Sequence, residues 1–308
     1  MEFVLQFGLL VVGFLMLSKG ADWFVDGASG IAARFGISQL IIGLTIVAMG
    51  TSAPEAAVSI AAAFKGSGDI TIGNIVGSNI LNILVILGVS SVITALAVAS
   101  STVRVEIPFM TVITVLLFWV GYDGNVNFFD GIILLAFFVV YLIYLYIAAK
   151  KGIGDENAEE FGTSLSHCII FSILGMALIL LGSEATVSAA KSIAAYAGLS
   201  ERFIGLTIVA LGTSLPELFT SVVAARRGNA DIAIGNIVGS NIFNILFVVG
   251  ISALVTPVQF SKAFIFDAYV AIAAALLLFV CVIASKKLER WAGAVMLLAY
   301  VSYIYYIL

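Results

Sequence analysis

A six-residue stretch that occurs twice constrains this chain more than any other feature. The sequence GTSAPE at positions 50–55 returns as GTSLPE at positions 212–217, and each copy lies inside a long apolar run. The surroundings repeat as well, since residues 42–50 match residues 204–212 at eight of nine positions. Residues 69–84 match residues 231–246 at fourteen of sixteen positions, again 162 residues apart. A constant offset over such lengths indicates a duplicated structural unit.

Composition places this duplicated unit in a membrane. The chain is 62% hydrophobic and 10% charged, whereas a soluble domain carries roughly 25% charged residues. Apolar runs of about 20 residues recur along the chain, which indicates membrane helices rather than a β-barrel. The first run follows Met1-Glu2-Phe3 without a basic region, so we expect a first membrane helix rather than a cleaved signal peptide. The net charge of −4 and the lack of a basic cluster exclude a nucleic-acid partner.

The apolar segments divide equally between the two copies. We expect ten, at about 3–33, 38–64, 70–97, 103–121, 128–149, 164–196, 202–225, 230–256, 262–285 and 290–308. Five helices per copy is an odd number, so the second copy must enter the membrane in the opposite sense to the first. The predicted fold class is therefore an all-α integral membrane protein with ten transmembrane helices in two inverted five-helix repeats, an arrangement typical of secondary transporters.

The predicted domain organisation follows from this division. Residues 1–150 form the first five-helix repeat, residues 151–163 a short acidic cytoplasmic linker, and residues 164–308 the second, inverted repeat. If both termini are extracellular, nine basic residues fall in cytoplasmic loops and three in external loops. This distribution obeys the positive-inside rule, and the reverse orientation violates it. We therefore expect a multi-pass protein of the cell membrane with extracellular N- and C-termini.

Each six-residue motif is expected to break its helix and to supply ion ligands. Pro54 has no backbone N–H, so the carbonyl of Gly50 loses its helical partner, and Gly50 allows the backbone to bend. Carbonyls freed within a membrane must be satisfied by protein, water or an ion. A charge at the bilayer centre costs about 2.5–3.5 kcal/mol on insertion scales, so Glu55 and Glu217 indicate function rather than packing. We predict that they form one cation site, to which Ser52 and Ser214 add hydroxyl oxygens.

A second repeated stretch provides further polar side chains. Asn74, Ser78 and Asn82 follow each other at intervals of four and share one helix face; Asn236, Ser240 and Asn244 do the same in the second copy. Gly73 and Gly77, like Gly235 and Gly239, have the spacing of small residues where membrane helices approach closely. Ser78, Asn82, Ser240 and Asn244 are predicted ligands. The sequence does not decide between ion coordination and interhelical hydrogen bonding for Asn74, Asn79, Asn236 and Asn241.

The other charges within the apolar segments indicate the membrane surface. Asp22 and Asp26, one turn apart and one turn beyond Lys19, are expected to pair with lysine or with lipid headgroups. Glu106 and Asp267 open the fourth and ninth segments, where snorkelling toward the interface would explain them.

The paired motifs G-T-S-x-P-E and G-N-x-x-G-S-N-x-x-N resemble the two α-repeats of the sodium/calcium exchangers, within the cation/Ca²⁺ exchanger superfamily. The resemblance covers the whole chain and is to the compact prokaryotic form. It implies that Glu55 and Glu217 bind Ca²⁺ together with the backbone carbonyls of Thr51 and Thr213. It also implies Na⁺ sites formed by the carbonyls of Ala48 and Ala210 and by the hydroxyls of Ser52, Ser214, Ser78 and Ser240. The amides of Asn82 and Asn244 match a central polar pair.

The resemblance implies a secondary antiporter that exchanges Na⁺ for Ca²⁺ by alternating access, electrogenic at three Na⁺ per Ca²⁺ and normally extruding Ca²⁺. Some relatives carry an acidic residue where this chain has Asn82 or Asn244, so a proton-coupled or K⁺-dependent antiporter of the superfamily is the alternative. A cation channel is a more distant one. No nucleophile or metal-catalysis motif indicates an enzyme. No cofactor is expected, because Ca²⁺ and Na⁺ are transported ions. The lipid bilayer is the other expected partner, and function as a monomer is compatible with the sequence.

Overall fold

The computed structural model describes residues 2–66, 68–151, 164–196 and 210–307, and the statements below refer to these residues. They are almost entirely helical. The first half comprises α1 (Glu2–Phe35), α2 (Gln39–Ile42), η1 (Gly43–Val47), α3 (Ala48–Thr51), α4 (Ala53–Phe64), α5 (Gly68–Leu81), η2 (Asn82–Leu87), α6 (Gly88–Ile93), η3 (Thr102–Glu106), α7 (Ile107–Val120) and α8 (Phe128–Lys150). The second comprises α9 (Leu165–Tyr196), α11 (Ala210–Thr213), α12 (Leu215–Arg226), α13 (Ala230–Phe243), η5 (Asn244–Val249), α14 (Gly250–Val255), α15 (Phe264–Ile283) and α16 (Arg290–Ile307). Segments labelled η are π-helical.

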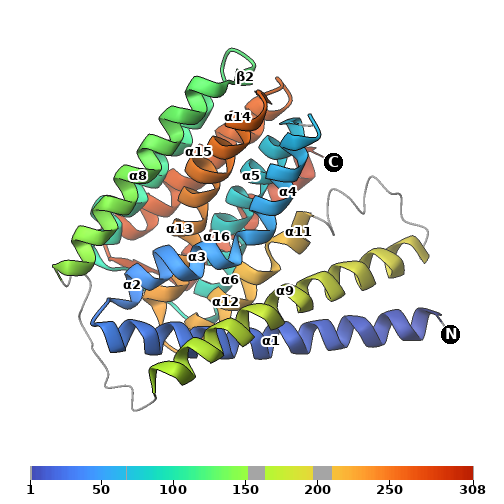
Figure 1. The fold of residues 1–308 in the computed structure, drawn as a ribbon, viewed down its shortest axis with the longest axis vertical. Helices are drawn as coiled ribbons and strands as arrows, with labels where there is room; N and C mark the ends of the chain where they lie inside the picture. The colour runs from blue at the N-terminus through green and yellow to red at the C-terminus, as the bar shows by residue number, and fades with distance from the viewer. Residues whose placement is uncertain (1, 67, 152–163, 197–209, 308) are drawn as a thin grey trace.

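The two longest helices, α1 and α9, lie side by side along one edge of the bundle (Figure 1). Glycines let them approach closely. A Cβ atom added at Gly20 would lie 2.8 Å from the carbonyl oxygen of Gly175, and one at Gly13 would lie 3.0 Å from that of Gly182. Residue numbers on α9 fall as those on α1 rise, so the two helices are antiparallel. Seven residues separate the contacts on each helix, which keeps one face of each turned toward the other.

The centre of the bundle is built around α5 and α13, the helices that carry the asparagine motifs. Every residue of α13 from Ile232 to Phe243 is buried. A Cβ atom at Gly235 would lie 2.9 Å from the carbonyl oxygen of Leu40, and one at Gly239 would lie 2.7 Å from that of Leu44. The predicted close approach at these two glycines is therefore confirmed. For Gly73 and Gly77, the residues equivalent to Leu40 and Leu44 are 202 and 206, which are outside the described residues.

The first motif breaks its helix as predicted. Segments Gln39–Thr51 and Ala53–Phe64 meet at 50°, with Ser52 between them and Pro54 in the first turn of α4. The second motif has the same layout, because Ser214 separates α11 from α12 and a proline again lies in the first turn. Proline suits a helix start, where its missing N–H has no carbonyl to bond.

The described helices have the lengths needed for a multi-pass membrane protein. Seven are long and apolar enough to cross a bilayer, and the bent pair Gln39–Thr51 with Ala53–Phe64 brings the number to eight. Two predicted segments are not among these eight. Part of the segment 202–225 lies outside the described residues, and the last segment forms α16, a helix of 18 residues.

Short strands join the two halves of the chain. β1 (Leu96–Ala97) pairs antiparallel with β4 (Lys287–Leu288), and β2 (Asn125–Val126) pairs antiparallel with β3 (Val258–Gln259). Helix α7 leads from β1 to β2, whereas α15 leads from β3 to β4. Because β1 adjoins β4 and β2 adjoins β3, α7 and α15 run in opposite directions between the same two strand pairs.

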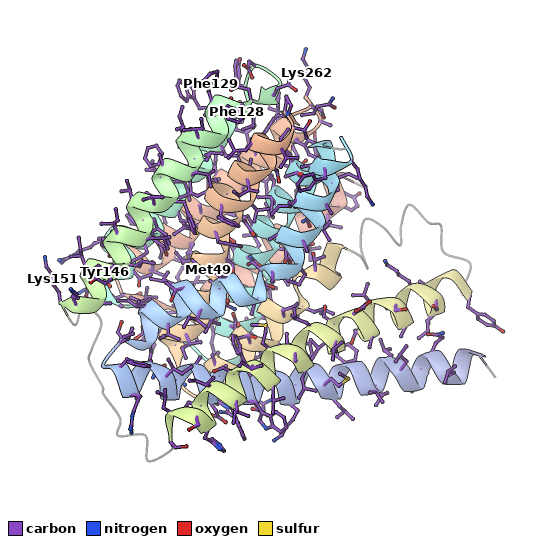
Figure 2. All side chains as sticks on the ribbon, in the orientation of Figure 1. Met49, Phe128, Phe129, Tyr146, Lys151 and Lys262 are labelled. Atoms are coloured by element: carbon purple, nitrogen blue, oxygen red, sulfur yellow. The ribbon has the colours of Figure 1, made fainter. Side chains whose placement is uncertain are left out.

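The outer surface is apolar in the middle and aromatic or charged at its ends. On α8, Val139, Val140 and Ile143 are more than half exposed. Figure 2 shows Phe128 and Phe129 near Lys262 at one end of the molecule, with Tyr146 and Lys151 at the opposite end. Aromatic and basic side chains are typical of the two membrane–water interfaces.

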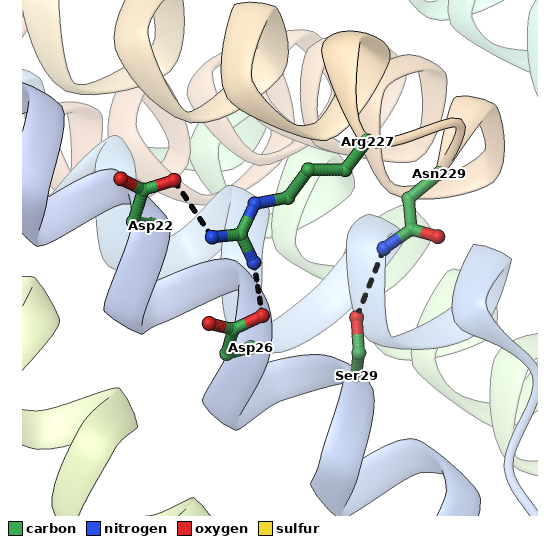
Figure 3. A network of polar contacts seen from close by, with 5 residues as sticks. All are labelled: Asp22, Asp26, Ser29, Arg227 and Asn229. Carbon is green, nitrogen blue, oxygen red and sulfur yellow. Dashed lines mark hydrogen bonds and ion pairs between the residues drawn. The ribbon is translucent and has the colours of Figure 1, made fainter.

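The predicted pairing of Asp22 and Asp26 with lysine or headgroups is wrong. Both carboxylates bind Arg227, at the end of α12, and the Asp22 contact measures 2.7 Å (Figure 3). Lys19 instead lies over the ring of Trp23, 5.7 Å from its centre. The tertiary fold brings Arg227 within reach, which sequence spacing does not reveal.

Snorkelling does not describe Glu106, which is 2% exposed and accepts a hydrogen bond from the phenol of Tyr144. Asp267 is half-buried and accepts a hydrogen bond of 2.8 Å from the phenol of Tyr303. In each case the carboxyl group is turned inward because a tyrosine on the next long helix supplies a donor.

Candidate functional site

The two motif glutamates lie at the centre of the structure, and each contacts the other half of the chain. Glu55 is in the first turn of α4 and Glu217 in the first turn of α12, and both are 1% exposed. The hydroxyl of Ser52 donates to Glu217 Oε1 over 2.8 Å, and that of Ser214 donates to Glu55 Oε1 over 3.2 Å. Glu55 and Glu217 therefore belong to one site, built from both halves, at two helix N-termini whose dipoles favour negative charge.

Four buried oxygen atoms of this centre have no hydrogen-bond partner among the described residues. They are Oε2 of Glu55, Oε2 of Glu217, Oδ1 of Asn82 and Oδ1 of Asn244. The ion pairs of the described residues include neither glutamate. Burying unpaired carboxylate and amide oxygens costs free energy, which a bound cation would offset. Carboxylate, amide and hydroxyl oxygens are the ligands that hard cations such as Ca²⁺ prefer.

The structure also brings together Ala48 and Ser240, two residues that the resemblance assigns to Na⁺ sites. Ser240 donates its hydroxyl to the carbonyl oxygen of Ala48 over 3.3 Å, although 192 residues separate them. Thr51 is fully buried, and its hydroxyl donates to Asn236 Oδ1 over 3.0 Å. Its side chain is therefore engaged in holding a neighbouring helix, whereas the sequence analysis assigned its backbone carbonyl to the ion.

The remaining predicted ligands lie on the elements expected for them. Ser78 is buried on α5, in the position that Ser240 occupies on α13. Ala210 and Thr213 begin and end α11, the short helix before the second break. The side chain of Ala210 lies outside the described residues, and the sequence analysis assigned only its carbonyl.

Asn74 and Asn236 hold helices together. Asn74 Nδ2 donates to Ser59 Oγ over 2.9 Å and to the backbone carbonyl of Glu55 over 3.2 Å. Asn236 makes the equivalent bonds to Ser221 and to the backbone of Glu217, at 2.9 and 3.4 Å. For this pair the structure favours interhelical hydrogen bonding, with the added effect that each amide fixes the backbone of a site glutamate.

Sequence reasoning missed the partners of these amides. Ser59 and Ser221 lie four residues after Glu55 and Glu217, on the same helix face, and both are fully buried. Their matching positions, 162 residues apart, were a signal that could have identified them.

A multi-pass helical membrane protein with a buried, oxygen-lined anionic centre has the form of an ion transporter, and comparison with known proteins defines the family. The family model described as sodium/calcium exchanger protein matches residues 5–147 and again residues 167–308. The sodium/calcium exchanger MaX1 of Methanosarcina acetivorans is 31% identical, with 97% of each chain covered. The inner membrane protein YrbG of Escherichia coli is 40% identical, with 82% of this chain and 81% of YrbG covered.

Solved structures agree. The sodium-calcium exchanger NCX_Mj, in a crystal soaked without Na⁺ and Ca²⁺, superposes with a TM-score of 0.87 at 32% identity, and 99% of each chain is covered. The chain therefore belongs to the sodium/calcium exchanger family, in its compact prokaryotic form. MaX1 and NCX_Mj are named sodium/calcium exchangers, which agrees with the expectation that this protein is not an enzyme.

Proposed function

We propose that this protein exchanges Na⁺ for Ca²⁺ across the cell membrane and that Glu55 and Glu217 are the carboxylates that bind Ca²⁺. The observation that carries this proposal is the pair of buried glutamates, each bonded to a serine of the other half and each with one oxygen that has no partner among the described residues. The chain's family and its likeness to MaX1 and NCX_Mj support the choice of ions.

Charge balance explains why such a site would exchange ions rather than leak them. Two ionised glutamates carry a charge of −2, which one Ca²⁺ cancels and three Na⁺ exceed by one. Moving the empty, doubly negative site through a medium of low dielectric constant is expensive. The carrier should therefore reorient readily when loaded and poorly when empty, with three Na⁺ entering for each Ca²⁺ extruded.

The proposed ligands divide into those of Ca²⁺ and those of Na⁺, with the amides of Asn82 and Asn244 as a central polar pair. Ca²⁺ is bound by the carboxylates of Glu55 and Glu217 with the carbonyls of Thr51 and Thr213. Na⁺ is bound by the carbonyls of Ala48 and Ala210 with nearby serine hydroxyls, those of Ser52, Ser78, Ser214 and Ser240. The contact between Ser240 and the carbonyl of Ala48 supports one of these groupings.

The proposed architecture has ten membrane helices in two inverted repeats, residues 1–150 and 164–308, joined by a cytoplasmic linker at 151–163. Opposite directions of α7 and α15 support the inversion, because these helices are equivalent in the repeat. Two separate matches of the family model support the division. Extracellular termini remain our prediction from the loop charges.

Alternating access would then require one part of the molecule to move past the site. Helices α1 and α9 are the candidates, because they pack on each other at the edge of the bundle (Figure 1). Helix α9 also contacts both broken helices: Ser183 donates to the carbonyl of Gly212 over 2.8 Å, and Met176 packs against Gly50. Movement of α9 along the bundle would thus change the surroundings of both motifs.

The deciding experiment is ⁴⁵Ca²⁺ uptake into proteoliposomes that contain the purified protein. An outward Na⁺ gradient should drive uptake against a Ca²⁺ gradient, which a channel cannot do. Uptake that needs only a pH gradient would make the protein a proton-coupled antiporter, and uptake that needs K⁺ as well as Na⁺ would make it K⁺-dependent. Either result would refute the proposed coupling.

Glu55→Gln and Glu217→Gln test the site itself. Each change keeps the side-chain shape and removes one negative charge, so Na⁺-driven uptake should fall to the level of empty liposomes. Ser302→Ala is a suitable control, because Ser302 is exposed on α16 and bonds only within its own helix. Melting curves should establish that all three variants are folded, and near-normal uptake by either glutamine variant would overturn the ligand assignment.

A further inference from the structure

Asn79 and Asn241 form a reciprocal hydrogen-bonded ring between the two halves of the chain, and Asn82 and Asn244 are each joined to it by one hydrogen bond. Asn79 Nδ2 donates to the backbone carbonyl of Asn241, and Asn241 Nδ2 donates to the backbone carbonyl of Asn79, both over 3.2 Å. Asn82 Nδ2 donates to Asn241 Oδ1 over 3.0 Å, and Asn244 Nδ2 donates to Asn79 Oδ1 over 3.1 Å. All four residues are at most 4% exposed.

The ring has a fixed direction because it starts at a backbone carbonyl. A carbonyl oxygen can only accept, so the atom of Asn79 that faces the carbonyl of Asn241 must be its nitrogen. Oδ1 of Asn79 then faces Asn244, and the atom of Asn244 that meets it must again be a nitrogen. The same sequence runs from the carbonyl of Asn79 through Asn241 to Asn82. In this way two backbone carbonyls determine which end of two further amides is free.

The free ends are the amide oxygens that belong to the cation site. Oδ1 of Asn82 and Oδ1 of Asn244 are buried and have no partner among the residues that the structure describes, like Oε2 of Glu55 and Oε2 of Glu217. Without the ring, either amide could rotate by half a turn. It would then present its NH₂ group, the positive end of its dipole, where an oxygen is needed to face a cation.

We propose that Asn79 and Asn241 are positioning residues, which contact no ion but orient the amide oxygens of Asn244 and Asn82 toward the bound cation. The inference rests on the proposed function, since it assigns these residues to the same site. It also separates the asparagines of the repeated motif by role. Asn74 and Asn236 hold the backbone of the glutamates, Asn79 and Asn241 orient, and Asn82 and Asn244 present oxygen.

A simpler account of the ring is that it only joins the two halves. The two accounts differ when the oriented group is changed, because a carboxylate has oxygen at both ends and does not need orienting. If Asn241 acts by orienting the amide of Asn82, then Ca²⁺ binding should no longer depend on Asn241 once Asn82 is replaced by aspartate. If Asn241 only joins the halves, Asn241→Ala should weaken Ca²⁺ binding by the same factor in the wild type and in the Asn82→Asp variant. A double-mutant cycle measures this difference.

The cycle compares four purified proteins: the wild type, Asn241→Ala, Asn82→Asp and the double variant. The readouts are the Ca²⁺ dissociation constant, from titration without Na⁺, and the melting temperature without either ion. We expect Asn241→Ala to weaken Ca²⁺ binding about 10- to 100-fold, the usual loss when a residue that orients a metal ligand is removed. In the Asn82→Asp background, the same substitution should leave the dissociation constant unchanged or lower it, since an aspartate oxygen no longer faces Asn241 Oδ1.

Equal weakening in both backgrounds, or none in either, would overturn the inference. Thr71→Val is the matched control: Thr71 is buried on α5, the helix of Asn79, and its hydroxyl donates to the carbonyl of Ser59 over 3.0 Å without touching the ring. It should lower the melting temperature while Ca²⁺ binding is retained. If a variant does not fold, the equivalent cycle of Asn79→Ala with Asn244→Asp gives the same test. Failure of wild-type Na⁺-driven uptake would refute the proposed function, whereas the inference fails only through the cycle.

Discussion

Three glutamates are buried among the residues that the structure describes, and their neighbours give them different roles. Glu55 and Glu217 each accept a hydrogen bond from a serine of the opposite half of the chain, and each keeps one oxygen without a partner among the described residues. Glu106 accepts its hydrogen bond from Tyr144 of the same half, on α8. An ion that binds between the halves can therefore use the first two carboxylates. Glu106 instead joins two neighbouring helices.

Tyr144→Phe tests the role of Glu106. The variant removes the donor to a carboxyl group that is 2% exposed, and leaving such a group without its partner costs about 1–3 kcal/mol. We expect a lower melting temperature with the Ca²⁺ affinity preserved. Tyr146→Phe is the control, because Tyr146 lies on the same helix and is 60% exposed. An unchanged melting temperature in Tyr144→Phe would show that the bond does not stabilise the fold.

At the scale of the elements, the contact between α1 and α9 depends on glycine. Gly20→Ala would place a methyl group 2.8 Å from the carbonyl oxygen of Gly175, so the helices must move apart. Overpacking of this kind costs about 1–3 kcal/mol, and both the melting temperature and the Na⁺-driven uptake should fall. Gly8→Ala, on the same helix, meets no atom within 4 Å among the described residues and should be neutral or slightly stabilising. Equal behaviour of the two variants would contradict this account of the helix pair.

A second link ties α1 to the rest of the bundle through Arg227. Figure 3 shows its guanidinium group between Asp22 and Asp26, while Asn229 donates to the hydroxyl of Ser29 over 3.3 Å. If α1 moves during transport, these ion pairs must break in each cycle. They are one third to one half exposed, so water screens them and together they stabilise this conformation by about 1 kcal/mol or less.

Arg227→Gln should therefore change the rate of exchange by no more than about fivefold, the factor that 1 kcal/mol represents. The difference from the wild type should shrink as the ionic strength of the uptake buffer rises, because salt screens exposed charges. Arg226→Gln serves as control, since Arg226 is exposed and takes part in none of the ion pairs of the described residues. An effect of Arg227→Gln that is independent of salt would exclude the electrostatic explanation.

For the whole molecule, the main prediction concerns the membrane potential. Three Na⁺ against one Ca²⁺ moves one net charge per cycle, and each charge contributes about 2.3 kcal/mol per 100 mV. At zero net flux, a potential of 100 mV should therefore shift the ratio of Ca²⁺ concentrations about 50-fold. Valinomycin with defined K⁺ gradients sets the potential in proteoliposomes. A ratio that does not respond to the potential would indicate an electroneutral exchange with two Na⁺.

The sequence predicted much of this fold because the physics of a bilayer leaves few alternatives. Backbone groups in lipid must be bonded within their own segment, so apolar runs such as 128–149 and 230–256 had to be helices. The helix break between Gly50 and Pro54 was predictable because Pro54 has no backbone N–H. The charges at the segment ends were harder, because Glu106 and Asp22 find their partners on other helices and no local pattern specifies those partners.

By itself, the sequence determined the class of the site: two carboxylates within apolar segments, each beside a helix break and repeated 162 residues apart. Only the tertiary structure decided how these groups combine. Ser52 bonds to Glu217 and Ser214 to Glu55, and Asn79 and Asn241 determine which atoms of Asn244 and Asn82 are free. The reason is physical: a side chain's type is local, but the direction in which its donors and acceptors point depends on residues about 160 positions away that folding brings within 3 Å.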